Sequence, residues 1–234
     1  MEIQELLNRF GGKKIDKASL SSYEQWSVDF FHQKDIVREP NLQMTLQLDI
    51  TEGYTYYQDQ LKDKDGASFT AYLMWCLVKT MDKHPYFRYR KLGNEWYIFD
   101  NLPTFSPIAV GGDKRFSEIM VEDPVNSTID EYFVNYRRGV DKAFSTDGDF
   151  EPLPPLVWAS AHFIGNLPNL QFTSFQLHQS ALDSARPYFY FGKRYQKHTQ
   201  MLIPISITFD HSNLDPFVLS AFMEDFDKAM INQL

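Results

Sequence analysis

Hydrophobic and polar residues alternate most regularly between residues 42 and 50. Apolar side chains occupy every even position from Leu42 to Ile50, and polar side chains occupy the odd positions between them. Because successive side chains of a strand point to opposite faces, the pattern predicts a strand with one apolar and one polar face. The polar face is either solvated or lines a subunit interface.

A second alternating run lies near the C-terminus. Ile203, Ile205, Ile207 and Phe209 share one parity, and His211 continues it. A strand through these residues points all five side chains to one face, which is apolar except for the histidine. This run and shorter apolar runs predict strands at residues 87–91, 95–99, 104–110, 115–121, 156–163, 171–177, 187–192 and 201–209.

Apolar residues recur at helical spacing between Ser68 and His84, in a stripe wide enough to be covered on more than one side. Pro85 follows directly and ends this helix. Similar spacing, with Ser21 or Ser22 as a cap before the second segment, predicts helices at residues 2–10, 23–33, 52–62, 129–144 and 217–234.

The strands and helices occur in groups rather than in strict alternation. This order favours an α+β fold, a two-layer sandwich with a mixed β-sheet. At 234 residues the chain is expected to form a single domain, residues 1–234, in which residues 1–20 are an N-terminal extension. A loop rich in Asp, Gly and Pro is expected at residues 145–155.

The formal net charge of −8 is spread along the chain rather than concentrated in a tail. No cluster of Lys and Arg is strong enough for electrostatic binding of nucleic acid, so we expect no nucleic-acid partner. No apolar run reaches the roughly 18 residues of a membrane span, and no signal-peptide pattern is present, which indicates a cytoplasmic protein. Cys76 lies in a helical apolar stripe and is expected to be an inert core residue.

His211 and Asp215 are the strongest candidates for chemistry, because they lie where the last predicted strand meets a helix. A histidine that ends an apolar row is either a hydrogen-bonded core residue or a general base in a pocket. Asp215 followed by Pro216 is equally typical of a helix start, with Asp as N-cap and Pro at the first helical position. The sequence has no G-x-S-x-G motif, and its histidines lack metal-ligand spacing, so no metal site is predicted.

The stretch Phe209–Asp215, with Pro216 and Phe217 after it, resembles the His-His-Ala-Val-Cys-Asp-Gly-Phe motif of the chloramphenicol acetyltransferase family. The acyltransferase cores of 2-oxo acid dehydrogenase complexes have a related Asp-His-Arg-x-x-Asp-Gly motif. Further segments are similar to the chloramphenicol acetyltransferase family, in its order, over residues 22–232: Trp26, Leu48–Thr51, Phe87-Arg88, Trp96–Asp100, Phe105–Ile108, Ile129–Tyr136, Ser160-Ala161, Pro187 and Gly192-Lys193.

The resemblance implies a CoA-dependent acyltransferase fold and transfer of an acetyl group from acetyl-CoA to a hydroxyl of a small molecule. Chloramphenicol is one candidate acceptor, and antibiotic resistance is then a role to test. The resemblance assigns His211 as general base, Ser160 as hydrogen-bond donor to the oxyanion and Asp215 as the structural aspartate. It assigns Lys193 and Tyr190 to the cofactor. It also implies a homotrimer with each site at a subunit interface.

Three positions depart from the family pattern. Val28 stands where the family has an arginine that pairs with the motif aspartate, Tyr190 replaces a threonine near the transition state, and Pro216 replaces the motif glycine. Phe30 and Phe31 either line an acceptor pocket or pack in the core. The departures keep a second hypothesis open, a fold relative that binds a ligand or partner without catalysis.

Overall fold

The computed structural model describes residues 1–113, 115–145, 153–178, 182 and 184–232. Short 3₁₀ turns cover Lys17–Ser19 and Pro85–Arg88, and a π-helical turn covers Tyr57–Leu61. The other elements of this part of the chain are α1 (Ile3–Phe10), β1 (Gly12–Lys14), α2 (Ser22–Phe30), β2 (Asn41–Asp49), α3 (Thr51–Tyr56), α4 (Phe69–Lys83), β3 (Tyr89–Leu92), β4 (Glu95–Phe99), β5 (Thr104–Gly111), β6 (Arg115–Val121), α5 (Ile129–Ser145), α6 (Pro155–Ser160), β7 (His162–Asn166), β8 (Tyr188–Phe191), β9 (Tyr195–Lys197), β10 (Gln200–Asp210) and α7 (Pro216–Ala229).

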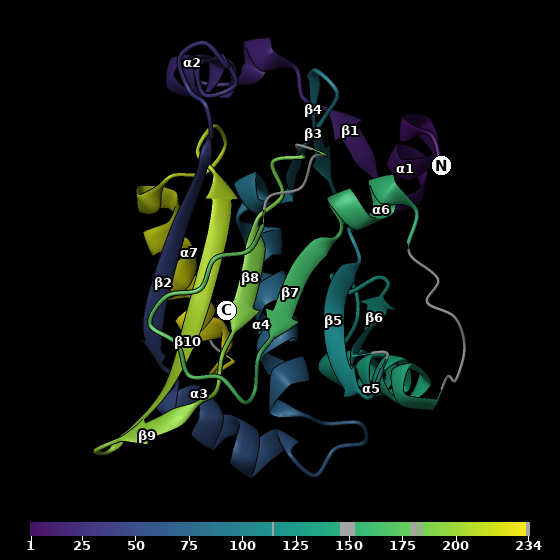
Figure 1. Cartoon of the computed structure of the whole chain (residues 1–234), viewed down its shortest axis with the longest axis vertical. Coiled ribbons are helices and arrows are strands. Elements are labelled where there is room, and N and C mark those ends of the chain that lie inside the picture. Colours follow the sequence, from purple (N-terminus) through teal and green to yellow (C-terminus); the bar gives the residue numbers. More distant parts are fainter. Residues whose placement is uncertain (114, 146–152, 179–181, 183, 233–234) are drawn as a thin grey trace.

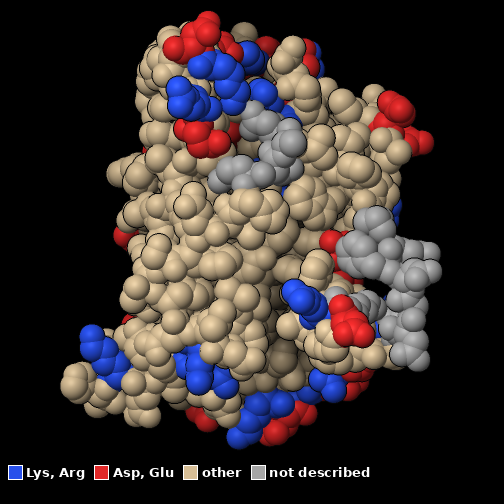
Figure 2. Space-filling view, viewed as in Figure 1, with Lys and Arg blue, Asp and Glu red and all other residues tan. Residues whose placement is uncertain are grey.

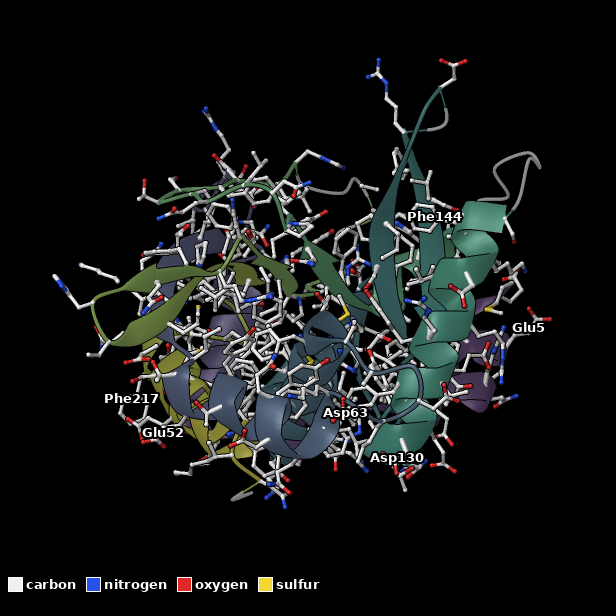
Figure 3. All side chains as sticks on the ribbon, turned by 90° about the horizontal axis from the view of Figure 1, so that it is seen from below. Glu5, Glu52, Asp63, Asp130, Phe144 and Phe217 are labelled. Carbon is white, nitrogen blue, oxygen red and sulfur yellow. The ribbon has the colours of Figure 1, made fainter. Side chains whose placement is uncertain are left out.

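Most of these elements form two layers, a mixed sheet and a set of helices packed across one of its faces (Figures 1 and 3), while β1, β4 and β3 form a separate small antiparallel sheet. The large sheet has the order β2-β10-β8-β7-β5-β6, in which β7 runs parallel to both β5 and β8 and the other pairs are antiparallel. The helices α4, α5 and α7 share the main core with the apolar row Ile203–Phe209 of β10. The predicted α+β fold with a mixed sheet is therefore confirmed.

The sheet order brings two distant segments to one end of the molecule. Thr208 of β10 pairs with Tyr188 of β8, and Tyr188 pairs in parallel with Phe163 of β7. The C-terminal end of β10 and the N-terminal end of β7 therefore lie at the same end of the sheet, two strand spacings or about 10 Å apart. His211 directly follows β10 and Ser160 precedes β7, so the fold places both at this end.

The polar face of β2 is partly covered by another segment of the same chain. Gln47 Nε2 donates to the carbonyl of Phe172 at 3.1 Å, and Gln43 Nε2 donates to the carbonyl of Phe175. On the neighbouring strand, Ser206 Oγ donates to the same Phe175 carbonyl at 2.6 Å. These side chains hydrogen-bond to backbone carbonyls of the segment that crosses this face, and they satisfy carbonyls that a neighbouring strand would otherwise bind.

Two strand predictions were wrong. Residues 171–177 form no regular element, and two of the segment's carbonyls are hydrogen-bonded to the side chains named above. Residues 156–163 were predicted as one strand, but Pro155–Ser160 forms α6 and the strand begins only at His162. A proline in the first turn favours a helix, and a short apolar run alone does not distinguish helix from strand.

The N-terminal residues contribute a strand that the sequence pattern does not predict. Gly12–Lys14 pairs with β4, and Leu6 and Phe10 of α1 are buried in a small core with Phe99 and Leu102. The single-domain boundaries 1–234 and the extension at residues 1–20 stay predictions. Most of the loop predicted at 145–155, and the last two residues of the helix predicted at 217–234, lie outside the described residues.

The remaining helix predictions agree with the structure to within a few residues. Cys76 is fully buried in α4, where burial raises the pKa of its thiol, as an inert core residue requires. No helix in the described ranges is long and apolar enough to cross a membrane.

Candidate active site

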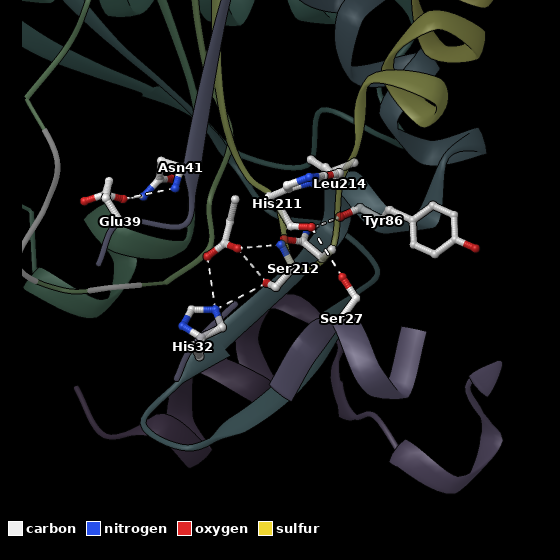
Figure 4. Close-up of polar contacts among 10 residues, drawn as sticks. Ser27, His32, Glu39, Asn41, Tyr86, His211, Ser212 and Leu214 are labelled. Atoms are coloured by element: carbon white, nitrogen blue, oxygen red, sulfur yellow. Dashed lines mark hydrogen bonds and ion pairs between the residues drawn. The ribbon is translucent and has the colours of Figure 1, made fainter. Parts of the chain in front are cut away.

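His211 lies in the turn that connects β10 to α7. Its backbone N–H donates to the carbonyl of Pro40 at 2.9 Å. Its Nδ1 lies 3.2 Å from the carbonyl oxygen of Leu214 (Figure 4). A carbonyl oxygen only accepts hydrogen bonds, so Nδ1 carries the proton in this contact. In the neutral ring, Nε2 is then left with a free lone pair, which is the state that a general base needs.

Phe31 covers the imidazole of His211, with ring centroids 4.4 Å apart and planes inclined by 35°. Phe31 packs edge-on against Phe30 at 5.3 Å, and Phe30 stacks on Trp26 at 4.7 Å. Trp26 is 49% exposed, so a continuous row of aromatic rings connects the half-buried histidine with the surface. The structure thus brings Phe31, but not Phe30, into direct contact with the candidate base.

Asp215 is the N-cap of α7. Its Oδ1 accepts hydrogen bonds from the backbone N–H groups of Phe217 at 2.8 Å and Val218 at 2.9 Å. Pro216 occupies the first helical position, where its missing N–H removes no hydrogen bond. Within the described ranges no Arg or Lys forms an ion pair with Asp215, so capping is the interaction that the structure assigns to it.

Asp215→Ala is expected to lower the free energy of unfolding by about 1 kcal/mol, because two N–H groups at the start of α7 lose their acceptor. Asp215→Ser is expected to keep most of this stability, since a serine hydroxyl caps helices nearly as well. Denaturant unfolding of both variants measures the effect. Equal destabilisation by Ser and Ala would mean that the carboxylate does more than cap the helix.

Asp210, immediately before His211, is completely buried and organises the turn. Its Oδ1 accepts from the backbone N–H of Ser212 at 2.8 Å and from the Ser212 hydroxyl at 2.6 Å, and its Oδ2 lies 3.1 Å from His32 Nε2 (Figure 4). Its backbone carbonyl accepts from the N–H of Leu214 at 3.1 Å. Asp210 and His32 were not predicted as site residues. The available signal was a carboxylate at the end of a strand that is otherwise almost entirely apolar or uncharged.

Ser160 ends α6 and is fully buried, whereas the sequence predicted it on a strand. Its carbonyl accepts from Arg90 Nε at 2.7 Å, but its Oγ has no hydrogen-bond partner in the described part of the chain. An unpaired buried hydroxyl costs about 1–3 kcal/mol, so such a group calls for an explanation. In one chain this hydroxyl is closed off from solvent.

The surroundings of Ser160 are positively charged. The guanidinium groups of Arg90 and Arg186 are both buried, and Arg186 stacks on the ring of Tyr188 at 4.4 Å. Burial and the charges of Arg90, Arg88 and Arg186 hold the pKa of His162 well below its usual range. Positive potential of this kind favours an anion near Ser160.

Tyr190 lies in the middle of β8, with its ring against Gly165 of β7. A Cβ atom at Gly165 would lie 2.2 Å from Tyr190 Cε1, so only glycine leaves room for the ring. The ring packs against Phe163 at 5.7 Å and Phe175 at 4.9 Å, and burial raises the pKa of Tyr190 to about 12. Tyr190 is therefore a neutral, mostly apolar side chain on the sheet face opposite the helices.

Lys193 follows β8 and lines a groove of about 240 Å³ together with Arg194, Asn166 and Thr70. The neighbouring Gly192 pairs with Pro204 of β10 through its N–H. Pro204 and His211 are seven residues apart, which corresponds to about 23 Å along a strand. One chain therefore does not bring the Lys193 groove and His211 together.

Comparisons with known proteins agree with this fold. The family model described as chloramphenicol acetyltransferase matches residues 18–227. A chloramphenicol acetyltransferase of Campylobacter coli is 26% identical over 191 residues, which cover 80% of this chain and 85% of that protein. A solved chloramphenicol acetyltransferase structure has a TM-score of 0.78 at 18% identity, covering 94% of this chain and 99% of its own. A dihydrolipoamide acetyltransferase of Azotobacter vinelandii has a TM-score of 0.64 at 15% identity, covering 94% and 92%.

The fold is thus the one shared by chloramphenicol acetyltransferases and the acyltransferase cores of 2-oxo acid dehydrogenase complexes. Because the family model spans most of its length, the chain belongs to the chloramphenicol acetyltransferase family, a family of acyltransferases.

Proposed function

We propose that the protein transfers an acetyl group from acetyl-CoA to a hydroxyl group of a small molecule, with His211 as general base. The observation that carries this proposal is the contact between His211 Nδ1 and the Leu214 carbonyl, which leaves Nε2 free to accept a proton. The row of aromatic rings beside His211 offers an apolar surface for the acceptor, and Phe31 is the ring in contact with the base.

In this mechanism Nε2 takes the proton of the acceptor hydroxyl while its oxygen attacks the thioester carbonyl. The carbonyl oxygen becomes an oxyanion, for which the unpaired Oγ of Ser160 and the positive surroundings of Arg90 and Arg186 are the candidate stabilisers. When the C–S bond breaks, the CoA thiolate leaves and takes up the proton from His211. The products are the acetyl ester and free CoA.

Lys193 and Arg194 are the candidate ligands of acetyl-CoA, because the groove that they line supplies the positive charge that a CoA phosphate needs. Arg194 also lies over the rings of Tyr54 and Phe69, at 5.1 and 5.6 Å. We propose Tyr190 as part of the apolar surface beside the cofactor rather than as a proton donor, since its raised pKa makes the hydroxyl a weaker acid.

We further propose a homotrimer in which each site lies between two subunits. The distance between the Lys193 groove and His211 along one chain supports this arrangement, because a second subunit is needed to join the two. Figure 2 supplies a second argument: charged residues gather at the two ends of the sheet face, and the described surface between them is almost uncharged. A face of this kind suits a subunit interface.

Release of free thiol from acetyl-CoA tests the proposed function. With a panel of hydroxyl acceptors that includes chloramphenicol, we expect thiol release that depends on both acetyl-CoA and acceptor and accompanies formation of an acetyl ester. Light scattering is expected to give three times the chain mass of 27.5 kDa. If no acceptor raised thiol release above background while acetyl-CoA still bound, the proposed reaction would be wrong.

That last result would favour the alternative, a fold relative that binds a ligand or partner without catalysis. One observation favours this alternative, namely that Ser160 Oγ is closed off within the chain. Turnover with any acceptor would exclude it.

A further inference from the structure

A pocket of about 300 Å³ lies beside His211, between α2, the turn after β10 and the first turn of α7. We refer to it as the His211 pocket. This volume is at the lower end of the range for small-molecule sites. Besides His211, the wall residues that matter for its chemistry are Glu24, Tyr86, Tyr89, Asn213 and Asp215.

Two acceptor atoms of this pocket, on Asn213 and Asp215, have no donor in the described part of the chain. Asn213 is 9% exposed, and its Nδ2 donates to the Tyr86 carbonyl at 2.9 Å, but its Oδ1 has no partner within the described ranges. Asp215 uses Oδ1 for the helix cap, and no described residue donates to its Oδ2. The described wall contains no Lys or Arg. The buried Asn213 Oδ1 is unfavourable without a donor, and a ligand in the pocket can supply one.

The pocket is also negatively charged. Hydrogen bonds from Ser21 and Tyr86 lower the pKa of Glu24, so its carboxylate is ionised at neutral pH. Burial, the hydrogen bond to Glu24 and the charges of Glu24 and Asp215 raise the pKa of Tyr86 to about 12. Both carboxylates therefore act on the same region, and the neutral Tyr86 hydroxyl does not offset them.

Aromatic rings form much of the remaining wall. Tyr86 and Tyr89 pack edge to face at 5.6 Å, and Tyr23, which is 53% exposed, lies at the surface side. Aromatic faces attract organic cations as well as apolar groups. A metal ion fits less well, because the described residues contain no group of three or more His, Cys, Asp or Glu side chains that could hold one. Charge, unpaired acceptors and rings together match a small organic cation.

We propose that the His211 pocket binds the acceptor through a positively charged amine, so that the acceptor is a hydroxyl compound that carries an ammonium group. The ammonium group lies near Glu24 and Asp215 and donates to Asn213 Oδ1, while the hydroxyl group meets His211. The hydroxyl part of this assignment rests on the proposed acetyl transfer. Binding of the amine does not depend on it and is measured separately.

Phenylalaninol and 3-phenylpropane-1,2-diol form a matched pair of probes, since they differ in a single ammonium-to-hydroxyl replacement. By ligand-observed NMR titration at pH 7, we expect phenylalaninol to bind about tenfold more tightly, because it gains both a charge interaction and a cation–π contact. Glu24→Gln is expected to reduce this preference to about twofold. Glutamine still accepts the hydrogen bond from the Ser21 N–H that caps α2, so the helix start is preserved.

Glu131→Gln is the matched control, because Glu131 makes the same type of capping contact with Thr128 and does not line the His211 pocket. It is expected to leave the preference unchanged. Equal affinities of the two probes, no binding of either, or a preference that survives Glu24→Gln would each overturn the proposal. A Glu24-dependent preference without thiol release from any acceptor would support the amine site and contradict the proposed acetyl transfer.

Discussion

His211→Ala is expected to reduce acceptor-dependent thiol release about 10³-fold, the loss typical of removing a general base. The residual rate comes from binding and orientation of the two substrates, which the substitution leaves in place. Initial rates at saturating acetyl-CoA measure the loss. Stability is expected to change by no more than about 1 kcal/mol, because the half-buried ring makes one hydrogen bond, from Nδ1 to the Leu214 carbonyl.

His211→Gln separates the proton transfer from the position of the side chain. Its amide N–H can still donate to a carbonyl and its size is similar, but it has no basic nitrogen. We expect Gln to be as inactive as Ala while unfolding at the wild-type denaturant concentration. Activity within threefold of wild type in either variant would exclude His211 as the base, whether or not acetyl-CoA binding changes.

Periodicity predicted the elements in which apolar side chains recur along one face. The structure contains the elements that these patterns predict: the alternating runs at 42–50 and 203–209 form β2 and β10, and the stripe of Ser68–His84 forms α4. The apolar side chains of each pattern pack in the main core. The strand predicted at residues 171–177 was wrong because this segment is held by side chains rather than by a neighbouring strand. Its carbonyls accept hydrogen bonds from the side chains of Gln43, Gln47 and Ser206. A hydrogen bond between a carbonyl and a distant side chain leaves no periodic pattern in the sequence.

The candidate site divides in the same way. His211 and the cap formed by Asp215 are local features, since each is defined by neighbours within a few residues. The contact between Asp210 and His32 joins residues far apart in the chain, and it depends on how α2 is placed across the end of the sheet. Sequence reasoning can name each residue but not their proximity, because no local rule specifies where a connecting segment lies.

Asp210→Ala is expected to be the most destabilising single change near the site. The Ser212 N–H and the Ser212 hydroxyl lose their acceptor, whereas His32 Nε2 loses a carboxylate oxygen at 3.1 Å but keeps the Ser212 hydroxyl at 3.2 Å. The carboxylate that is removed is completely buried. At about 1 kcal/mol or more for each of the two unsatisfied groups, the free energy of unfolding should fall by about 2 kcal/mol, and Tm by about 6 °C. Calorimetry measures both.

Asp210→Asn tests whether Asp210 also positions the base. Asparagine can still accept from the Ser212 N–H, so the chain is expected to fold, but one of its two terminal atoms becomes a donor facing His32 or Ser212. The turn that ends at Leu214 then loosens, and with it the carbonyl that holds His211 Nδ1–H. We expect kcat to fall about tenfold while KM for acetyl-CoA is unchanged, because Lys193 lies near the other end of β10.

The ¹⁵N signals of His211 in the Asp210→Asn variant should show a mixture of tautomers, whereas the Asp215→Ser variant should keep a single tautomer. A stable Asp210→Asn variant with wild-type kcat and one tautomer would restrict Asp210 to a structural role.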